Sequence, residues 1–261
     1  MPNAAATPGP VPGTETDPLK KLDAAVIAER PTRHYRAALF QAYVLGASVV
    51  FVVLAFAAHW IAYFPIDLTI TRLVQSDHGR VFDRVMYGVS WLGFFPQVIA
   101  VSAVVMLALF FAGLRWETVA TLFASASSGV GSLVKLAVFR PRPSADLIHV
   151  FRQLPSSGFP SGHVLSTTAF CGFLVFLCFT LLKSSPGRTA MLVALSLLIA
   201  LMGPSRIYLG QHWFSDVMGA YLFGSLWLAL TIRFYRWGKT RYFVHQPVAP
   251  AAPAASEVGT A

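Results

Sequence analysis

The sequence predicts an all-α fold, a polytopic membrane bundle of six transmembrane helices. Hydrophobic residues make up 56% of the 261 residues and charged residues only 12%, whereas charged residues make up about a quarter of a soluble domain. The chain also contains six apolar runs, whose interiors hold no Lys, Arg, Asp or Glu. Because a helix needs about 20 apolar residues to cross the hydrocarbon core of a bilayer, these runs indicate membrane spans.

The runs cover residues 37–63, 94–114, 118–134, 164–182, 189–202 and 217–232. The last two are short for a span, so we extend the fifth to residue 209 and the sixth over residues 215–235. Both ends of the chain are rich in Ala and Pro, and we expect residues 1–30 and 243–261 to be disordered cytoplasmic tails. Residues 31–242 then form one membrane domain. The first residues contain neither a basic nor an apolar segment, so we expect no secretory signal there.

The basic residues predict the orientation of the bundle. With the amino terminus in the cytoplasm, twelve of the 20 Lys and Arg residues fall on the cytoplasmic side and eight on the outer side. Three of those eight, Lys135, Arg142 and Arg206, are candidates for a binding site, and the remaining residues follow the positive-inside rule. We therefore expect an integral protein of a bacterial inner membrane, with both termini cytoplasmic.

Residues 65–93, between the first two spans, combine charged residues with regularly spaced apolar ones. The pattern predicts one or two amphipathic helices at the outer membrane surface. An ordinary solvated loop is the alternative.

The predicted topology places a cluster of cations at the outer face. Lys135 ends the third run, Arg206 ends the fifth, and Arg142 lies between Pro141 and Pro143 in a stiff segment. The guanidinium group binds phosphate oxygens in pairs and the ammonium group acts as a point charge. The cluster therefore predicts a phosphate site, with a carboxylate ligand as the second choice and contact with lipid headgroups as the alternative.

Two histidines occur at the same face. Ser161, Gly162 and His163 precede the fourth run, where Ser161 can cap the helix, Gly162 lets the backbone approach an anion, and His163 can protonate a leaving oxygen. His212 and Asp216 start the sixth span at a spacing that places both on one helix face, where the carboxylate can orient the imidazole. Such a histidine is a candidate nucleophile or base. The alternative is a helix-start carboxylate beside an interfacial histidine.

We expect no metal ion and no other cofactor. His163, His212 and Asp216 could be written as three metal ligands, with Asp146 and His149 as further candidates, but three nearby cations would repel a divalent ion. The net charge of +9 does not indicate a nucleic acid partner, because the sequence has no basic stripe with interleaved aromatic residues.

Three motifs resemble those of the type-2 phosphatidic acid phosphatase family. The first is Lys135, six residues and Arg142-Pro143. The second is Pro160-Ser161-Gly162-His163, and the third is Ser205-Arg206, five residues, His212, three residues and Asp216. The six-span plan resembles the membrane branch of that family. The family shares its anion-binding motifs with the soluble vanadium haloperoxidases, whose branch does not fit six membrane runs.

The resemblance implies a metal-independent mechanism. His212 attacks phosphorus and becomes a phosphohistidine, Asp216 holds the other ring nitrogen, and His163 protonates the leaving oxygen and then assists water. The phosphoryl oxygens are bound by Lys135, Arg142, Ser161, the backbone of Gly162, and Arg206. A neutral His212 and a protonated His163 predict a bell-shaped pH dependence.

The function predicted from these residues is hydrolysis of a lipid phosphate or diphosphate at the outer face. Candidate substrates are phosphatidate, phosphatidylglycerophosphate, a polyprenyl diphosphate and a glycolipid phosphate, and we expect no obligate protein partner. A lipid phosphotransferase with the same phosphohistidine is one alternative. A transporter of anionic lipids is another, although transport sites usually lie near the membrane midplane.

Overall fold

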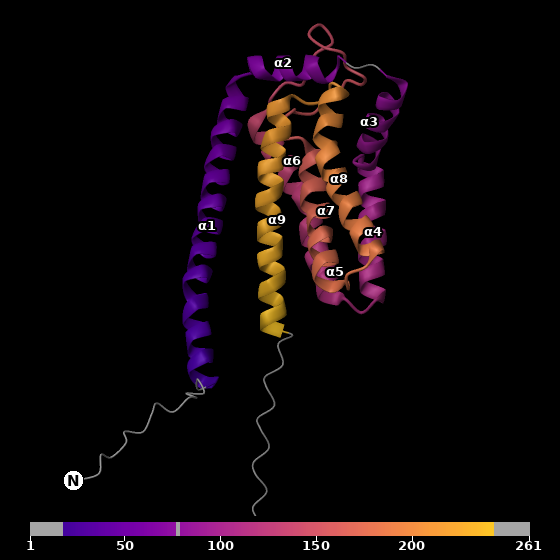
Figure 1. Ribbon diagram of the computed structural model, residues 1–261. Helices are drawn as coiled ribbons and strands as arrows, with labels where there is room; N and C mark the ends of the chain where they lie inside the picture. Colours follow the sequence, from indigo (N-terminus) through magenta and orange to yellow (C-terminus); the bar gives the residue numbers. More distant parts are fainter. Residues whose placement is uncertain (1–17, 77–78, 243–261) are drawn as a thin grey trace, which may run out of the picture. The chain divides into compact units, whose positions relative to one another are not determined.

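The computed structural model describes residues 18–76 and 79–242, and this part of the chain contains nine helices and no strands. The helices are α1 (Pro18–Trp60), α2 (Pro65–Val74), α3 (Arg80–Leu92), α4 (Phe95–Phe111), α5 (Arg115–Ser125), α6 (Ser127–Val138), α7 (Gly162–Leu181), α8 (Pro186–Tyr208) and α9 (Phe214–Tyr242). The chain divides into two compact units, residues 1–46 and 47–261. Helices α2 to α9 belong to the second unit and are shown in Figure 1.

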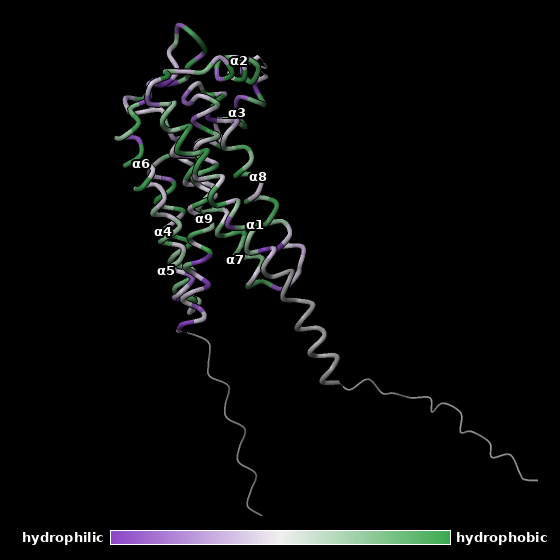
Figure 2. Tube along the Cα trace, turned by 90° about the vertical axis from the view of Figure 1, so that its left-hand side faces the viewer, coloured by the Kyte–Doolittle hydropathy of each residue, from purple (hydrophilic) through white to green (hydrophobic). Residues whose placement is uncertain are grey.

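The predicted all-α membrane bundle is confirmed. Five helical segments are long and apolar enough to cross a membrane, and they are Tyr35–Trp60, Arg115–Val138, Gly162–Leu181, Pro186–Tyr208 and Phe214–Tyr242. Helices α3 and α4 form a sixth when they are taken as one span bent by 60°. Figure 2 shows hydrophobic residues predominating along α4 to α9, as burial in lipid requires.

Two elements differ in detail from the prediction. The third span is divided at Ala126 into α5 and α6, and the second predicted span corresponds to α4, which needs α3 to reach full length. Residues 65–93 form two helices, α2 and α3, so the predicted helices are present. Helix α3 passes the test for a membrane span together with α4, which differs from the predicted position at the outer surface. Helix α1 begins at Pro18, so it includes residues 18–30, which are rich in good helix formers such as Ala, Leu and Lys. The remaining parts of the two predicted tails, residues 1–17 and 243–261, lie outside the described residues.

Helix α7 forms the centre of the bundle. Its apolar window is 67% buried, whereas that of α5–α6, α8 or α9 is 28% buried. One core cluster joins Val164 and Leu165 of α7 to Met202 of α8 and Val217 of α9. Because α7 begins at Gly162, this packing fixes the end of the bundle that carries the predicted site.

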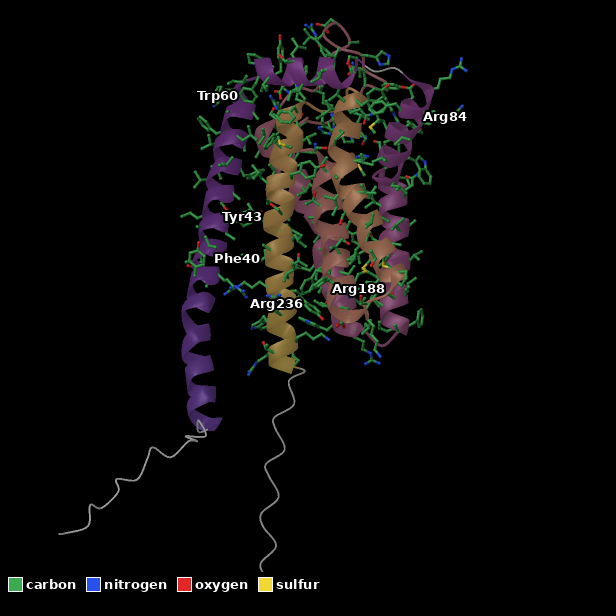
Figure 3. All side chains as sticks on the ribbon, in the orientation of Figure 1. Phe40, Tyr43, Trp60, Arg84, Arg188 and Arg236 are labelled. Atoms are coloured by element: carbon green, nitrogen blue, oxygen red, sulfur yellow. The ribbon has the colours of Figure 1, made fainter. Side chains whose placement is uncertain are left out.

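The polar connections gather at one end of the bundle. Figure 1 shows α2, the connection between α6 and α7, the end of α8 and the start of α9 together at that end. Figure 3 shows Arg188 and Arg236 at the opposite end, and Arg84 pointing away from the bundle near the start of α3. The topology therefore brings segments that are far apart in sequence to one end of the bundle.

Candidate active site

The predicted nucleophile His212 is buried, with 1% of its surface exposed, in the connection between α8 and α9. Its Nδ1 lies 2.8 Å from the carbonyl oxygen of Gly158, and its Nε2 lies 3.1 Å from Nη1 of Arg142. A guanidinium group can only donate hydrogen bonds, and a carbonyl can only accept them. The proton of His212 therefore sits on Nδ1, and Nε2 carries the lone pair.

The surroundings of His212 keep its ring neutral. Burial lowers the pKa of His212 well below its usual value of 6.5, and the positive charges of Arg142, Lys135 and Arg206 lower it further. A neutral imidazole with an unprotonated Nε2 is the form that can act as a nucleophile.

Asp216 lies beside His212, but its hydrogen bonds go elsewhere. Its Oδ2 is 3.6 Å from Nδ1 of His212, which is too long for a hydrogen bond, and instead accepts from the backbone N–H of Trp213 at 3.0 Å. Its Oδ1 pairs with Arg140 at 2.6 Å. Helix α9 begins at Phe214, so His212 precedes the helix rather than forming its first turn. The predicted proximity is therefore present, whereas Nδ1 is held by Gly158 in place of the predicted carboxylate.

Two of the predicted phosphate ligands bind the segment before α7. Nζ of Lys135 donates to the carbonyl of Ser157 at 2.8 Å. Arg142 donates through Nε to the carbonyl of Ser156 at 2.7 Å and through Nη1 to the carbonyl of Gln211 at 2.5 Å. Both cations thus contact backbone next to His212, because Ser157 precedes Gly158 and Gln211 precedes His212. We call the region bounded by Lys135, Arg142, the start of α7 and His212 the cradle.

Arg206, the third predicted cation, is fully buried at the end of α8. It donates to Oγ of Ser90 on α3 and to Oε1 of Gln211. Its Nε is buried and has no hydrogen-bond partner among the described residues. A buried donor of this kind is costly unless a ligand or water satisfies it.

The start of α7 presents two further buried polar atoms. Ser161 occupies the N-cap position, but its hydroxyl makes no capping bond, contrary to the prediction, and its backbone N–H donates to the carbonyl of Asp216 at 3.2 Å. Oγ of Ser161 and Nε2 of His163 are buried without a partner in the described part of the chain. Gly162 lies next to Lys135, whose Cε would be in ordinary contact with a Cβ at this position, at 3.9 Å. These atoms can hydrogen-bond the oxygens of a bound anion.

The ring of His163 is held in place by the bend between α3 and α4. It packs edge-to-face on Phe94 with ring centroids 5.3 Å apart. A Cβ at Gly93 would lie 2.4 Å from Cδ2 of His163, so only glycine permits this approach. The bend therefore positions the predicted acid at the edge of the cradle.

Two buried charged residues outside the three motifs, Arg140 and Asp67, also contact the site. Arg140 pairs with Asp216 at 2.6 Å and with Asp67 at 2.9 Å, and all three side chains are 0% exposed. The available signals were the position of Arg140 two residues before Arg142 and the single carboxylate of Asp67 in the first turn of α2. Neither signal identifies a partner, because the contacts join residues more than 70 positions apart.

The alternative metal ligands do not form a cluster. Within residues 18–76 and 79–242, no three His, Cys, Asp or Glu residues are grouped so as to hold a metal ion. Asp146 is exposed, and the hydroxyl of Ser144 lowers the pKa of its carboxyl group. The backbone of His149 is bound by the side chain of Gln75.

The fold and the site define a membrane protein in which three cations and two histidines are grouped at one end of a helix bundle. A model of the PAP2 superfamily matches residues 117–239, which contain every predicted site residue, so the resemblance seen in the motifs is confirmed. Residues 117–239 belong to the PAP2 superfamily.

Individual proteins agree with this assignment. Phosphatidylglycerophosphatase B of Bacillus subtilis is 28% identical over 182 residues, which are 67% of this chain and 86% of that protein. The crystal structure of a transmembrane PAP2-type phosphatidylglycerolphosphate phosphatase from B. subtilis superposes with a TM-score of 0.66 at 24% identity, covering 77% of this chain and 98% of that one. LpxE of Aquifex aeolicus superposes with a TM-score of 0.54 at 20% identity, covering 66% and 98%. These two structures share the fold of this chain.

Proposed function

We propose that this protein is a lipid phosphatase that hydrolyses a phosphate or diphosphate ester through a phosphohistidine, without a metal ion. The observation that carries the proposal is the state of His212. Its Nδ1 proton is bound by the Gly158 carbonyl, and its Nε2 lone pair faces Arg142 within a cluster of cations. An unprotonated nitrogen beside an anion-binding cradle is suited to attack on phosphorus.

The reaction proceeds in two displacements. In the first, Nε2 of His212 forms a bond to phosphorus while the ester P–O bond breaks, and His163 gives its proton to the departing oxygen. In the second, His163 takes a proton from water, whose oxygen attacks phosphorus and breaks the P–N bond. Lys135, Arg142 and Arg206 stabilise the charge on the phosphoryl oxygens in both steps. Asp216 lies close enough to His212 to stabilise the positive ring that forms during transfer.

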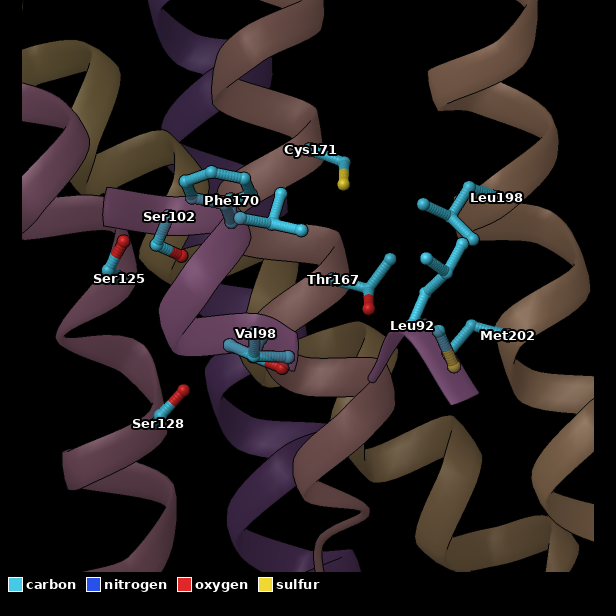
Figure 4. Close-up of a pocket in the computed structure, with 12 residues that line it drawn as sticks. Leu92, Val98, Ser102, Ser125, Ser128, Thr167, Phe170, Cys171, Leu198 and Met202 are labelled. Atoms are coloured by element: carbon cyan, nitrogen blue, oxygen red, sulfur yellow. The ribbon is translucent and has the colours of Figure 1, made fainter. Parts of the chain in front are cut away.

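An internal cavity supports a lipid substrate. The cavity has a volume of about 80 Å³ and lies between α4, α7, α8 and the α5–α6 segment. Figure 4 shows the side chains that line it. Two of its lining residues, Ser166 and Thr167, lie one helical turn from His163, and a third, Leu92, directly precedes Gly93. A mainly apolar cavity within one helical turn of the predicted acid can accept the first part of a hydrocarbon chain.

The named relatives suggest which lipid to test first. The B. subtilis relative and the B. subtilis crystal structure both name a phosphatidylglycerophosphate phosphatase, so phosphatidylglycerophosphate is our first candidate substrate. The deciding experiment measures phosphate released by the purified protein from this lipid, phosphatidate and a polyprenyl diphosphate in detergent. Release that persists in a chelator is expected. Transfer of labelled phosphate to a second lipid instead of water would identify a phosphotransferase, and no release from any of these lipids would refute the proposal.

The cavity predicts a selective effect on lipid substrates. Ser102 lines it from α4 and is 7% exposed. We expect Ser102→Phe to fill the cavity and to raise the KM for a long-chain lipid phosphate about tenfold, because displacing a few buried methylene groups costs on the order of 1–2 kcal/mol. The KM for a short-chain soluble phosphate ester should stay within about twofold. Ser132→Phe, at an exposed position of α6, is the matched control. Equal KM changes for both substrates would contradict a role of the cavity in chain binding.

The state of His212 predicts the acid side of the pH profile. Because burial and neighbouring cations lower its pKa well below 6.5, His212 remains neutral until the pH falls below that value, and protonation then removes the nucleophile. We expect kcat/KM, which reports the free enzyme, to fall with decreasing pH at a midpoint clearly below 6.5. Stopped assays from pH 4 to pH 9 at constant ionic strength would measure this midpoint. A midpoint above 6.5 would show that another group, or a solvated histidine, controls the activity.

We propose that the protein lies in a bacterial inner membrane, with both termini in the cytoplasm and the site at the periplasmic face. The support is the positive-inside bias together with the position of Arg188 and Arg236 at the end of the bundle opposite the site (Figure 3). In this arrangement, residues 31–242 form the membrane domain and the residues outside it form cytoplasmic tails.

A further inference from the structure

We propose that Arg140, held by Asp67, is a positioning residue for the nucleophile His212, an inference that rests on the proposed phosphatase function. Neither residue belongs to the three motifs. Arg140 lies in a buried bridge between α2, the segment after α6 and the start of α9. From this position it fixes both groups that approach Nδ1 of His212, which are the carboxylate of Asp216 and the carbonyl of Gly158.

The first route runs through the side chain of Arg140. Its Nη1 lies 2.6 Å from Oδ1 of Asp216 and its Nη2 lies 2.9 Å from Oδ2 of Asp67. Its Nε donates to the carbonyls of Ile61 and Ala62 at 3.2 and 3.1 Å. Every nitrogen of the guanidinium is therefore bound, as a charge with 0% exposure requires. The bridge holds Asp216 in a fixed orientation and offsets its charge.

The second route runs through the backbone of Arg140. The N–H of Gly158 donates to the carbonyl of Arg140 at 2.8 Å, and the N–H of Arg140 donates to Oγ of Ser157 at 3.0 Å. The carbonyl of Gly158 in turn accepts the proton of Nδ1 of His212 at 2.8 Å. A Cβ at Gly158 would lie 3.0 Å from Oδ2 of Asp216. Gly158 is thus packed between Arg140 and Asp216, with its carbonyl directed at the nucleophile.

Asp67 ties this bridge to the first turn of α9. Its Oδ1 accepts the backbone N–H of Ser215 at 2.7 Å, and its Oδ2 accepts the hydroxyl of Ser215 at 2.8 Å. The first N–H groups of a helix lack partners within the helix, and Trp213, just before α9, has no side-chain acceptor. Asp67 of α2 therefore caps α9 from another helix. Because Asp216 is in the same turn, the cap also fixes the carboxylate beside His212.

The charges around His212 determine how many protons its ring carries. The charged and titratable groups that face His212 are Lys135 of α6, Arg142, His163 of α7, Arg206 of α8 and Asp216 of α9. Asp216 is the only anion in that set, and Arg140 offsets its charge. Because the charge of the carboxylate is offset, His212 keeps a single proton, on Nδ1, and its Nε2 stays unprotonated beside Arg142.

The test compares Arg140→Gln with Asp67→Asn. The first variant removes a positive charge near Asp216 and the second removes a negative one, so the two change its surroundings in opposite directions. Without the guanidinium, the negative charge of Asp216 favours a second proton on His212, so the acid midpoint of kcat/KM should move to higher pH. Without the charge of Asp67, Arg140 acts on Asp216 alone, so the midpoint should move to lower pH. In both variants kcat should fall by about 10² while KM changes little, because a displaced nucleophile is costly whereas the phosphate ligands stay in place. Arg84→Gln and Asp146→Asn, at exposed positions, are the matched controls.

A second readout is independent of turnover. Nitrogen-15 NMR of histidine-labelled protein in detergent should show His212 of the wild-type protein as the Nδ1–H tautomer, with a protonation midpoint that shifts in the same two directions. If the wild-type protein releases no phosphate, the proposed function fails, yet these spectra still test the positioning role. If Arg140→Gln does not fold, the Asp67→Asn variant alone tests the proposal. This variant is expected to fold, because asparagine can still accept the N–H of Ser215. Unchanged midpoints in folded variants, or a raised KM with normal kcat, would overturn the proposal.

Discussion

Replacing His212 by alanine is expected to abolish phosphate release, with a loss of kcat on the order of 10⁴-fold or more, the size seen when a nucleophile is removed from an enzyme that depends on it. Such a loss corresponds to about 5 kcal/mol of transition-state stabilisation. The phosphate cradle stays intact in this variant, so the substrate should still bind. The measurement is phosphate release from the preferred lipid, with binding followed separately by displacement of a labelled substrate.

A chemical trap identifies the step that His212→Ala removes. Brief mixing of the wild-type protein with phosphorus-32-labelled lipid, followed by quenching in alkali, should leave label on the protein that is lost in acid, as expected of a phosphohistidine. The variant should carry no label. His149→Ala, at an exposed histidine near the same end of the bundle, should label and turn over normally. Normal turnover by His212→Ala would refute the nucleophile assignment.

The sequence predicted most of the membrane architecture because lipid imposes simple requirements on it. An apolar run of sufficient length must form a helix in a bilayer, and α5 to α9 lie where such runs lie in the chain. The alternation of spans then predicted that Lys135, His163, Arg206 and His212 share one end of the bundle, since consecutive spans end at opposite faces. Figure 1 shows the end of α8 and the starts of α7 and α9 at that end. Topology, rather than any single motif, made the site predictable.

The partners of the site residues could not be predicted in the same way. Asp216 has three donors within reach, from His212, Trp213 and Arg140, and tertiary packing decides that it binds the last two. The spacing between His212 and Asp216 predicts proximity but does not determine a hydrogen bond. The carbonyl of Gly158 carries no sequence signature, because every residue has a carbonyl. A buried network of this kind is visible only once distant segments are placed together.

Ser161 shows the same limit at a helix start. Serine before a helix predicts a capping bond, yet its hydroxyl makes none, and its backbone N–H bonds to Asp216 of α9. The local preference for a cap is worth only about 1 kcal/mol. Contacts between α7 and α9 can outweigh it and leave the hydroxyl available to a ligand.

His163→Ala should lower kcat for a lipid phosphate by about 10² to 10⁴, because the departing alkoxide is a poor leaving group without a proton. For p-nitrophenyl phosphate, whose leaving group needs no proton, the first step should slow far less. The ratio of kcat/KM between the two substrates, measured in both proteins, isolates the role of His163 as an acid. A loss that is equal for both substrates would instead indicate that His163 only binds the phosphoryl group.

The geometry of His163 leaves its Nε2 available to a leaving oxygen. Nε2 of His163 has no partner among the described residues, while its ring is fixed against Phe94 and Gly93. A side chain that is held in one orientation with an unused polar atom is prepared to exchange a proton at a defined point. Gly93→Ala offers an independent check, because its Cβ would displace the His163 ring without removing the imidazole. It should reproduce the leaving-group dependence of His163→Ala in weaker form.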